Sequence, residues 1–357
     1  MCLLIVLFVV VVSLLKSSAL DNTWTPSSTA PDKCWNAVAS DQSGDTQIGL
    51  VCLGGGIWIS RDQQDSWQQT SAPNENWFRA CVSSDGANMV AGVSGGNVYY
   101  SSDNGNLWEV SAGAPSGEWN GFACSSSGRY VIGVYWTSGI WRSSNFGASF
   151  TLSNSPGSEY WSSAASDSTG QYTLATVGYP DGNGQIWRSS NYGQDWSVLS
   201  DSPVGAWSWV TSSSDGANLV GCIYGGLIYY SPDSGVSWTV ATGISTANWF
   251  GLTASSSGQY VGAIVGCYDG GCTDGALYLS QDYGASWILS TAPAGTSFSA
   301  IASSASGAIM IASTGASTIY NGVVQVVAEP SAAPNQEPSA APTVASTAAP
   351  SVTLDNT

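Results

Sequence analysis

Three glutamates stand one or two residues before an aromatic residue, at regular spacing along the first half of the chain. They are Glu75, Glu118 and Glu159, in the stretches PNENW, PSGEW and PGSEYW. Two carboxyl groups that face each other can hydrolyse a glycosidic bond, one as the acid and the other as the base or nucleophile. Carboxylates beside aromatic rings also bind sugars without chemistry, because they accept hydrogen bonds from hydroxyls while a ring packs on the sugar's C–H face. These positions are candidates for either role.

The composition excludes most other chemistry. The chain has no histidine, which removes Ser-His-Asp and Cys-His nucleophiles and the zinc sites that need imidazole. Seven Lys and Arg against 24 Asp and Glu give a formal net charge of −17, and such a surface repels nucleic acids and anionic lipids. We expect no nucleic-acid partner, no cofactor and no metal. Asp181, Asp269 and Asp274 offer oxygens for calcium but lack an EF-type spacing.

Two landmarks recur in constant register and define the elements that must position the glutamates. The first is an aromatic residue, present as Trp35, Trp77, Trp119, Trp161, Trp207, Trp249 and Phe298. The second is a glycine nine residues later, present as Gly44, Gly86, Gly128, Gly170, Gly216, Gly258 and Gly307. Both series have gaps of 42, 42, 42, 46, 42 and 49 residues. We infer seven copies of one unit.

Each unit has the pattern of four short strands. The fifth copy reads WSWVTSSSDG, ANLVGCIY, GGLIYY and SPDSGVSWTVA, with glycine-bearing turns between alternating apolar stretches. Units of about 40–45 residues with four strands, repeated four to eight times, are typical of a β-propeller. We predict an all-β fold, a seven-bladed β-propeller of four-stranded antiparallel blades. The glutamates then lie where inner strands begin, near the central axis.

The last unit leaves two ways to close the ring. Asn321-Gly322 could turn the chain into a fourth strand, VVQVV, or the segment around Trp24 could supply that strand from the N-terminus. We favour the N-terminal segment, because exposed strand edges must be covered. The longer gaps place insertions in VGYPDGNGQIW and GCYDGGCTDGALY, between the second and third strands. Insertions confined to one face often mark the binding face of a repeat protein.

A repeated octapeptide, exemplified by SPDSGVSW at 231–238, occurs in six units. Complete copies contain Ser101, Asp103, Gly105 and Trp108; Ser231, Asp233, Gly235 and Trp238; and Ser280, Asp282, Gly284 and Trp287. Asn replaces Asp in Ser143, Asn145, Gly147 and Phe150 and in Ser189, Asn191, Gly193 and Trp196, while Ser60, Asp62 and Trp67 belong to a copy without the glycine. The octapeptide resembles the Asp-box, or BNR repeat, and residues 24–327 resemble the sialidase-like Asp-box propeller superfamily.

The resemblance implies that the octapeptides are hairpin turns at the periphery of the blades. Asn can bond the amides of a turn as Asp does but cannot replace a catalytic carboxylate, so the boxes are structural. The superfamily contains sialidases, xyloglucanase-type glycosidases, sorting-receptor ectodomains and a photosystem II assembly factor, so the fold does not decide the function. Sialidases need three arginines around the substrate, and only Arg79 lies on an inner strand here. We therefore expect no sialidase.

The ring aromatics allow two interpretations. They could wedge between blades, with the glutamates as solvated loop charges. Alternatively, they could form an aromatic and acidic mouth that binds sugar. On the second interpretation, the predicted ligand-binding residues are Trp35, Trp77, Arg79, Trp119, Trp161, Trp207, Trp249 and Phe298. If the protein is a glycosidase instead, the catalytic candidates are Glu75, Glu118 and Glu159.

The ends of the chain and the cysteines bear on its location. We predict a signal peptide at 1–19, a propeller at 20–327 and a disordered Pro/Ala/Ser/Thr-rich stalk or linker at 328–357. No basic residue precedes the apolar run, which leaves an uncleaved membrane anchor as the alternative. We predict a disulfide between Cys267 and Cys272, and Cys34 and Cys52 could face each other across a hairpin. Cys81, Cys124 and Cys222 are interpreted as small buried residues.

These observations predict a secreted or cell-surface propeller without catalytic activity. We expect it to bind an extracellular glycan or protein, or to serve as a structural unit of a wall, matrix or surface appendage. The alternative is a carboxylate-dependent glycoside hydrolase of the sialidase-like superfamily. Cleavage of the leader would leave seven of the eight cysteines, an odd number, which permits a disulfide-linked or polymeric assembly.

Overall fold

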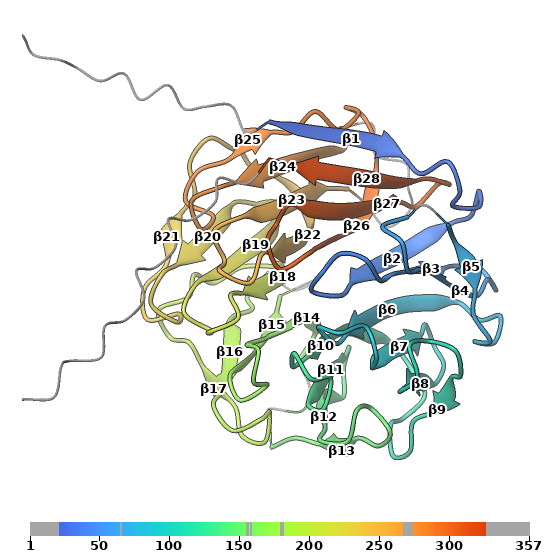
Figure 1. Ribbon diagram of the computed structural model, residues 1–357. Coiled ribbons are helices and arrows are strands. Elements are labelled where there is room, and N and C mark those ends of the chain that lie inside the picture. Colours follow the sequence, from blue (N-terminus) through green and yellow to red (C-terminus); the bar gives the residue numbers. More distant parts are fainter. Residues whose placement is uncertain are drawn as a thin grey trace, which may run out of the picture. The chain divides into compact units, whose positions relative to one another are not determined.

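The computed structural model describes residues 21–325, except 65, 155–156, 158, 179–181 and 267–273. These residues form 28 strands and no helix (Figure 1). The chain divides into one compact unit, residues 1–326, and a second unit, 327–357, which lies outside the described residues. A search of the described residues for a helix long and apolar enough to cross a membrane finds none. The predicted leader, the tail and the Cys267–Cys272 pair fall outside the described ranges.

The strands fall into four sets by their place in each sheet. The inner strands are β2 (Trp35–Ser40), β6 (Trp77–Val82), β10 (Trp119–Cys124), β14 (Trp161–Ser166), β18 (Trp207–Ser212), β22 (Ala247–Ala254) and β26 (Phe298–Ser303). The second strands are β3 (Gln47–Val51), β7 (Met89–Val93), β11 (Val131–Tyr135), β15 (Thr173–Val177), β19 (Leu219–Gly226), β23 (Val261–Val265) and β27 (Ile309–Thr314). The third strands are β4 (Ile57–Ser60), β8 (Val98–Ser101), β12 (Gly139–Ser143), β16 (Ile186–Ser189), β20 (Ile228–Ser231), β24 (Ala276–Ser280) and β28 (Ile319–Val324). The outer strands are β5 (Gln68–Gln69), β9 (Glu109–Val110), β13 (Thr151–Leu152), β17 (Ser197–Val198), β21 (Thr239–Val240), β25 (Ile288–Leu289) and β1 (Asn22–Pro26).

The sheets form a closed ring, as in a β-propeller. All pairings between these named strands are antiparallel, and β19 also pairs with β22, which joins two four-stranded sheets into one of eight strands. Each inner strand contacts the next, and β26 returns to contact β2. The 28 strands therefore fit seven blades of four strands, which we number by their inner strands from β2 to β26. We call the face where inner strands begin the front face, and the face where they end the back face.

Seven backbone hydrogen bonds link the blades at the back face. The bonded residues are Gln42, Ser84, Ser126, Ser168, Ser214, Ser256 and Ala305, and each amide donates to the carbonyl of the next residue at 2.7–3.0 Å. The amide of Ala305 donates to Gln42, so the series closes on itself. We call it the backbone ring. It fixes the spacing of all seven inner strands at their C-terminal ends.

The N-terminal segment closes the last blade, as predicted. Strand β1 pairs with β28, and the two lie side by side in Figure 1 although one is near the start of the described chain and the other near its end. The side chain of Asn22 is buried, and its Oδ1 atom accepts a hydrogen bond from the amide of Thr291 at 2.9 Å. The alternative with a turn at Asn321-Gly322 is wrong, because both residues lie inside β28.

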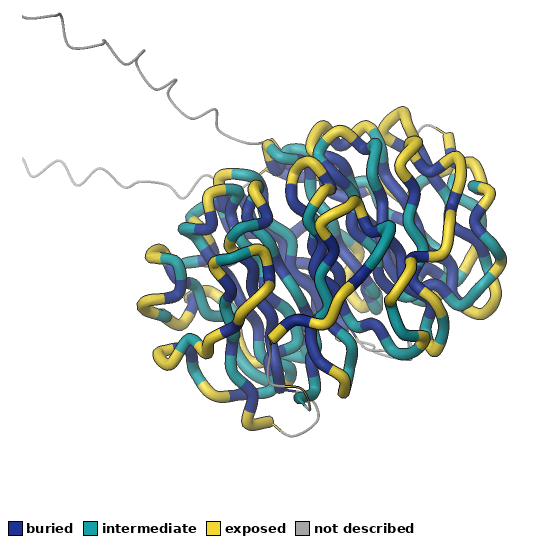
Figure 2. The backbone as a smooth tube through the Cα atoms, turned by 90° about the horizontal axis from the view of Figure 1, so that it is seen from below, coloured by how far each residue is buried: buried dark blue, intermediate teal, exposed yellow. Residues whose placement is uncertain are grey.

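The ring aromatics are the largest buried side chains. All seven have at most 1% of their surface exposed, and each opens its inner strand or, for Trp249, lies just inside it. Trp35 packs against Trp67 and Trp207 against Trp238, at centroid distances of 6.0 and 5.8 Å. Glycine on the second strand makes room, since a Cβ atom at Gly49 would lie 2.6 Å from the ring of Trp35. Burial runs along the strands while the connecting turns are exposed (Figure 2).

Two disulfides are present among the described residues. Cys34–Cys52 joins the segments that flank the first hairpin of blade one, as its spacing suggested. Cys81–Cys124 joins β6 to β10, with 5.8 Å between the Cα atoms. Our interpretation of Cys81 and Cys124 as unpaired core residues is therefore wrong. It failed because adjacent inner strands bring residues 43 positions apart together. Cys222 is a buried thiol, and burial raises its pKa to about 12.

Candidate functional site

The octapeptide turns share one hydrogen-bond network. In the copy that begins at Ser231, the serine hydroxyl donates to Oδ1 of Asp233 at 2.8 Å and accepts from the amide of Gly235 at 2.8 Å. The same Oδ1 atom accepts from the amide of Ser237 at 2.8 Å. Gly235 has a φ of +89°, which glycine adopts without steric cost. The hydroxyl and the carboxylate thus replace strand pairing inside the turn.

The copies with asparagine make the same bonds. Ser189 donates to Oδ1 of Asn191 at 2.9 Å, and that atom accepts from the amide of Asp195 at 2.9 Å. In the copy without glycine, Gln64 takes a φ of +77° and its amide still donates to Ser60 at 2.8 Å. The turn therefore uses a side-chain oxygen as an acceptor and needs no negative charge. This agrees with a structural role and explains why Asn is tolerated.

The ring aromatics are too buried to bind a ligand. With at most 1% exposure, the seven rings cannot offer a face to a sugar unless the blades separate. The interpretation in which they line an open mouth is therefore corrected. All seven side chains belong to the hydrophobic clusters of the blades.

The three candidate glutamates lie on the front face, half-buried, at the start of β6, β10 and β14. The amide of Glu75 donates to the carbonyl of Gly55 at 2.8 Å. Oε2 of Glu118 accepts a hydrogen bond from the hydroxyl of Ser94 at 2.9 Å. None of the three glutamates lines any of the three cavities described below.

An aromatic pair that the sequence analysis missed lies beside Glu118. The backbone of Trp136 bridges two inner strands, because its amide donates to Glu118 at 2.9 Å and its carbonyl accepts from Trp161 at 3.0 Å. Its ring meets Tyr160 edge to face, with 6.3 Å between centroids, and both residues are half-buried. We call Glu118, Trp136 and Tyr160 the front cluster. The available signal was Trp136 itself, which follows the second strand in VYWTSG.

Arg79 blocks the central axis. Its side chain is 6% exposed, and its guanidinium lies 4.0 Å from the ring of Phe78 and 5.3 Å from that of Trp209, which belongs to blade five. Arg79 and Trp209 line two small cavities of about 20 and 40 Å³. Smaller residues at the matching positions of other inner strands, such as Ala37 and Gly121, leave the space that this pair fills. Arg79 therefore separates the front of the axis from the back.

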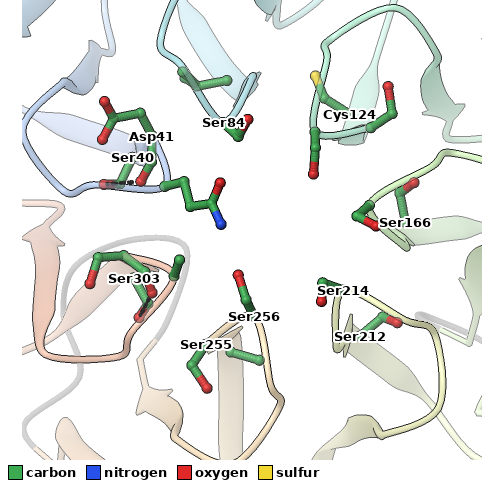
Figure 3. A pocket seen from close by; sticks show the side chains of 18 of the residues that line it. Ser40, Asp41, Ser84, Cys124, Ser166, Ser212, Ser214, Ser255, Ser256 and Ser303 are labelled. Atoms are coloured by element: carbon green, nitrogen blue, oxygen red, sulfur yellow. Dashed lines mark hydrogen bonds between the residues drawn. The ribbon is translucent and has the colours of Figure 1, made fainter. Parts of the chain in front are cut away.

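The largest of the three cavities, about 230 Å³, opens at the back face and is lined mainly by serines. The hydroxyls of Ser84, Ser214 and Ser256 point into it (Figure 3). Among the described residues, these three hydroxyls make no hydrogen bond with the chain. Two buried carboxylates also line it, Asp41 and Asp167, and both are bound within their own turns, for example by the amide of Gly44 at 2.7 Å. The cavity suits water or neutral hydroxyl groups.

The described residues hold no group of three or more His, Cys, Asp or Glu side chains that could bind a metal. Of the aspartates that the sequence analysis considered for calcium, Asp181 and Asp269 lie outside the described ranges. The carboxylates of the turns instead accept hydrogen bonds within their own turns. The pKa of Asp233 is lowered by hydrogen bonds from the hydroxyl and then the amide of Ser237, and that of Asp215 by a hydrogen bond from Ser213.

Comparisons with known proteins agree with the fold. No protein-family model and no curated protein matches the chain. YCF48 from Cyanidioschyzon merolae is 16% identical, with 84% of this chain and 98% of that one covered and a TM-score of 0.63. A structure of YCF48 bound to a D1 peptide is 13% identical, with 86% and 99% covered and a TM-score of 0.64. A GH74 enzyme from Niastella koreensis is 15% identical, with 84% and 53% covered and a TM-score of 0.64, so the chain spans about half of that enzyme. At these identities, the likeness shows a shared β-propeller fold.

Proposed function

We propose that the chain is a seven-bladed Asp-box propeller of the sialidase-like superfamily that acts outside the cell as a binding module without catalytic activity. The count of 28 strands and the shared network of the octapeptide turns support the first part. The two disulfides hint at an oxidising, extracellular environment and support the second. Its partner is an extracellular glycan or protein, and we favour a glycan.

The observation that carries the glycan proposal is the front cluster. Tyr160 and Trp136 present half-buried aromatic rings, and the backbone amide of Trp136 is bonded to the backbone carbonyl of Glu118. Since the backbone of Trp136 is bonded to both flanking inner strands, little conformational entropy remains to be lost on binding. Aromatic faces and a carboxylate acceptor complement the C–H faces and hydroxyls of a pyranose.

The alternative is a glycoside hydrolase. The similarity in fold to GH74 enzymes is the reason to test it. Hydrolysis needs two carboxyl groups about 5–10 Å apart across the scissile bond. Glu118 is bonded to Ser94 of the neighbouring loop, and the three glutamates precede three different inner strands. The chain also spans about half of the GH74 enzymes it matches. These facts favour binding over hydrolysis.

A glycan-array screen of the recombinant chain tests the proposal. Trp136→Ala and Glu118→Gln should each lower binding to any recognised glycan by about tenfold or more, since both remove direct contacts. The matched control is Ser84→Ala in the back-face cavity, which should bind normally. Loss of binding in the Ser84 variant alone would move the site to the back face. Normal folding without binding to any glycan would reject the glycan proposal.

A further inference from the structure

The two octapeptide turns that carry Asn lie next to each other, and each directly follows an arginine. Arg142 precedes the turn of Asn145 in blade three, and Arg188 precedes the turn of Asn191 in blade four. The network of the turn is the same with Asn as with Asp. The fold therefore does not require Asn at these two positions. The use of Asn in place of Asp removes two negative charges from one part of the back face.

Charge on the back face is segregated as a result. In the turns of blades three and four, three arginines (Arg129, Arg142 and Arg188) stand against two aspartates (Asp167 and Asp195). The corresponding turns of the other five blades carry, among the described residues, one arginine and eight aspartates: Arg61 against Asp41, Asp45, Asp62, Asp85, Asp103, Asp215, Asp233 and Asp282. In a chain of net charge −17, blades three and four thus form an isolated basic area.

Aromatic side chains gather in the same area. The rings of Tyr130 and Tyr192 are in contact, tilted by 33° with 4.3 Å between centroids, and Arg129 lies 5.4 Å from the ring of Tyr130. Arg188 lies 4.9 Å from the ring of Tyr172. Tyr172 and Tyr192 are 36% and 37% exposed, so both rings reach the solvent. Tyrosine and arginine are the side chains that most often dominate binding at protein interfaces.

A turn position with a left-handed backbone conformation adds an exposed aromatic residue to each of blades three and four. Phe146 and Tyr192 occupy the turn position with φ of +63° and +61°, where bulky residues are disfavoured. At the same position blade two has Asn104, blade five has Ser234 and blade six has Tyr283, with φ of +60°, +61° and +62°. Of the three blades with an aromatic residue at this position, only blades three and four also carry arginine in or beside their back-face turns.

We propose that Arg129, Tyr130, Phe146, Tyr172, Arg188 and Tyr192 form a docking surface for a short acidic segment of a partner protein. The arginines pair with its carboxylates, and the tyrosine rings pack against its side chains. A short segment fits better than a long polyanion, because the flanking turns are acidic and repel any chain that extends beyond two blades. This surface is on the opposite face from the front cluster, so it does not depend on the glycan proposal.

Fluorescence anisotropy with two pools of labelled synthetic peptides, each eight residues long, tests the docking surface directly. One pool contains four Asp or Glu residues in each peptide and the control pool contains Asn or Gln instead. We expect saturable binding of the acidic pool, weakened by added salt because exposed charges are screened. Failure of the acidic pool to bind, equal binding of both pools, or binding of polygalacturonate in place of peptides would overturn the proposal.

Three variants test the docking surface without disturbing the fold. Matching positions in other blades already contain two of the three new residues, so the fold tolerates them. Tyr192→Ser copies blade five, Asn145→Asp copies the complete turns, and Arg129→Gln changes an exposed side chain. In Asn145→Asp, Ser149 can turn to donate as Ser237 does to Asp233. Each variant should weaken binding by about threefold to tenfold. Tyr283→Ser and Arg61→Gln, on blades six and one, are the matched controls and should bind normally; equal losses in variants and controls would refute the surface.

Discussion

The ring of Trp24 lies directly over Gly322, and a Cβ atom at position 322 would be 2.5 Å from it. Trp24 belongs to β1 and Gly322 to β28, so this contact joins the two ends of the described chain. Trp24 is 8% exposed, and the pair lies in the core of blade seven together with Phe298 and Met310. The packing of this tryptophan on this glycine therefore reinforces the pairing of β1 with β28 that completes blade seven.

Gly322→Ala should destabilise the protein by about 1–3 kcal/mol, because the added methyl group overlaps the indole and pushes β1 away from β28. Urea unfolding measures the free energy. Gly157→Ala is the control, since a Cβ atom there meets nothing within 4 Å and should leave stability within about 0.5 kcal/mol. Equal effects of the two substitutions would show that the closing strand does not pack as described.

The octapeptide turn should accept Asn but not Ala at position 233. Asp233→Asn keeps the acceptor for the hydroxyl of Ser231 and the amide of Ser237, so the midpoint of urea unfolding at neutral pH should stay close to that of the unsubstituted protein. Asp233→Ala leaves both donors without their partner and should lower the midpoint of urea unfolding clearly below that of the Asn variant. The same urea titration distinguishes the two. A large loss for the Asn variant would mean that the charge itself is needed.

Hydrogen bonds within the turns should make stability depend on acid pH. The pKa of Asp233 lies below its ordinary value of 3.8, first because of the hydroxyl of Ser237 and then because of its amide. A carboxyl group whose pKa is lowered by folding stabilises the protein above its unfolded-state pKa, and this contribution is lost as the pH falls through the lowered value. Asp62 and Asp103 have the same sign.

The expected result is a fall in the free energy of unfolding as the pH decreases from about 5 to about 2. Asp233→Asn removes one titrating group, so its stability should fall less steeply over this range. Urea titrations at several pH values measure both curves. Parallel curves would show that the hydrogen bonds of Asp233 do not favour its charged form.

The disulfide between neighbouring blades should stabilise the ring. Cys81 and Cys124 are 43 residues apart, and closing a loop of that size contributes about 4 kcal/mol in the chain-entropy model. Cys81→Ser with Cys124→Ser should lower the unfolding free energy by a comparable amount while leaving the Cys34–Cys52 pair intact. Peptide mass mapping verifies the remaining bond. An unchanged unfolding free energy would place the stability of this interface in the backbone ring instead.

Much of the fold was predictable because its repeat is visible twice over. The aromatic and glycine landmarks share one register, and each inner strand begins at or near the predicted aromatic residue. The closing strand was predictable from Trp24, since an outer strand was missing from the last unit. The pairing of Cys81 with Cys124 was not, because it depends on the distance between adjacent inner strands, which no local pattern encodes.

The candidate site was harder to predict than the fold. Aromatic residues at a repeat landmark can face the axis or the core, and the pattern of the sequence does not distinguish the two. The buried side chains of Trp119 and its counterparts show that these positions belong to the core. The half-buried aromatic is Trp136, at a position that most other units fill with a small residue. Glu118 was found because it stands next to a landmark, and its bond to Ser94 arises only from the folded loops.

The measurement that tests the central proposal most directly is time-resolved proton NMR of a glycan selected by the array, mixed with the protein. We predict line broadening of the glycan that is absent with Trp136→Ala, and unchanged anomeric signals over a full day. New anomeric signals that appear with the protein and are abolished by Glu118→Gln would contradict the account and identify a glycoside hydrolase.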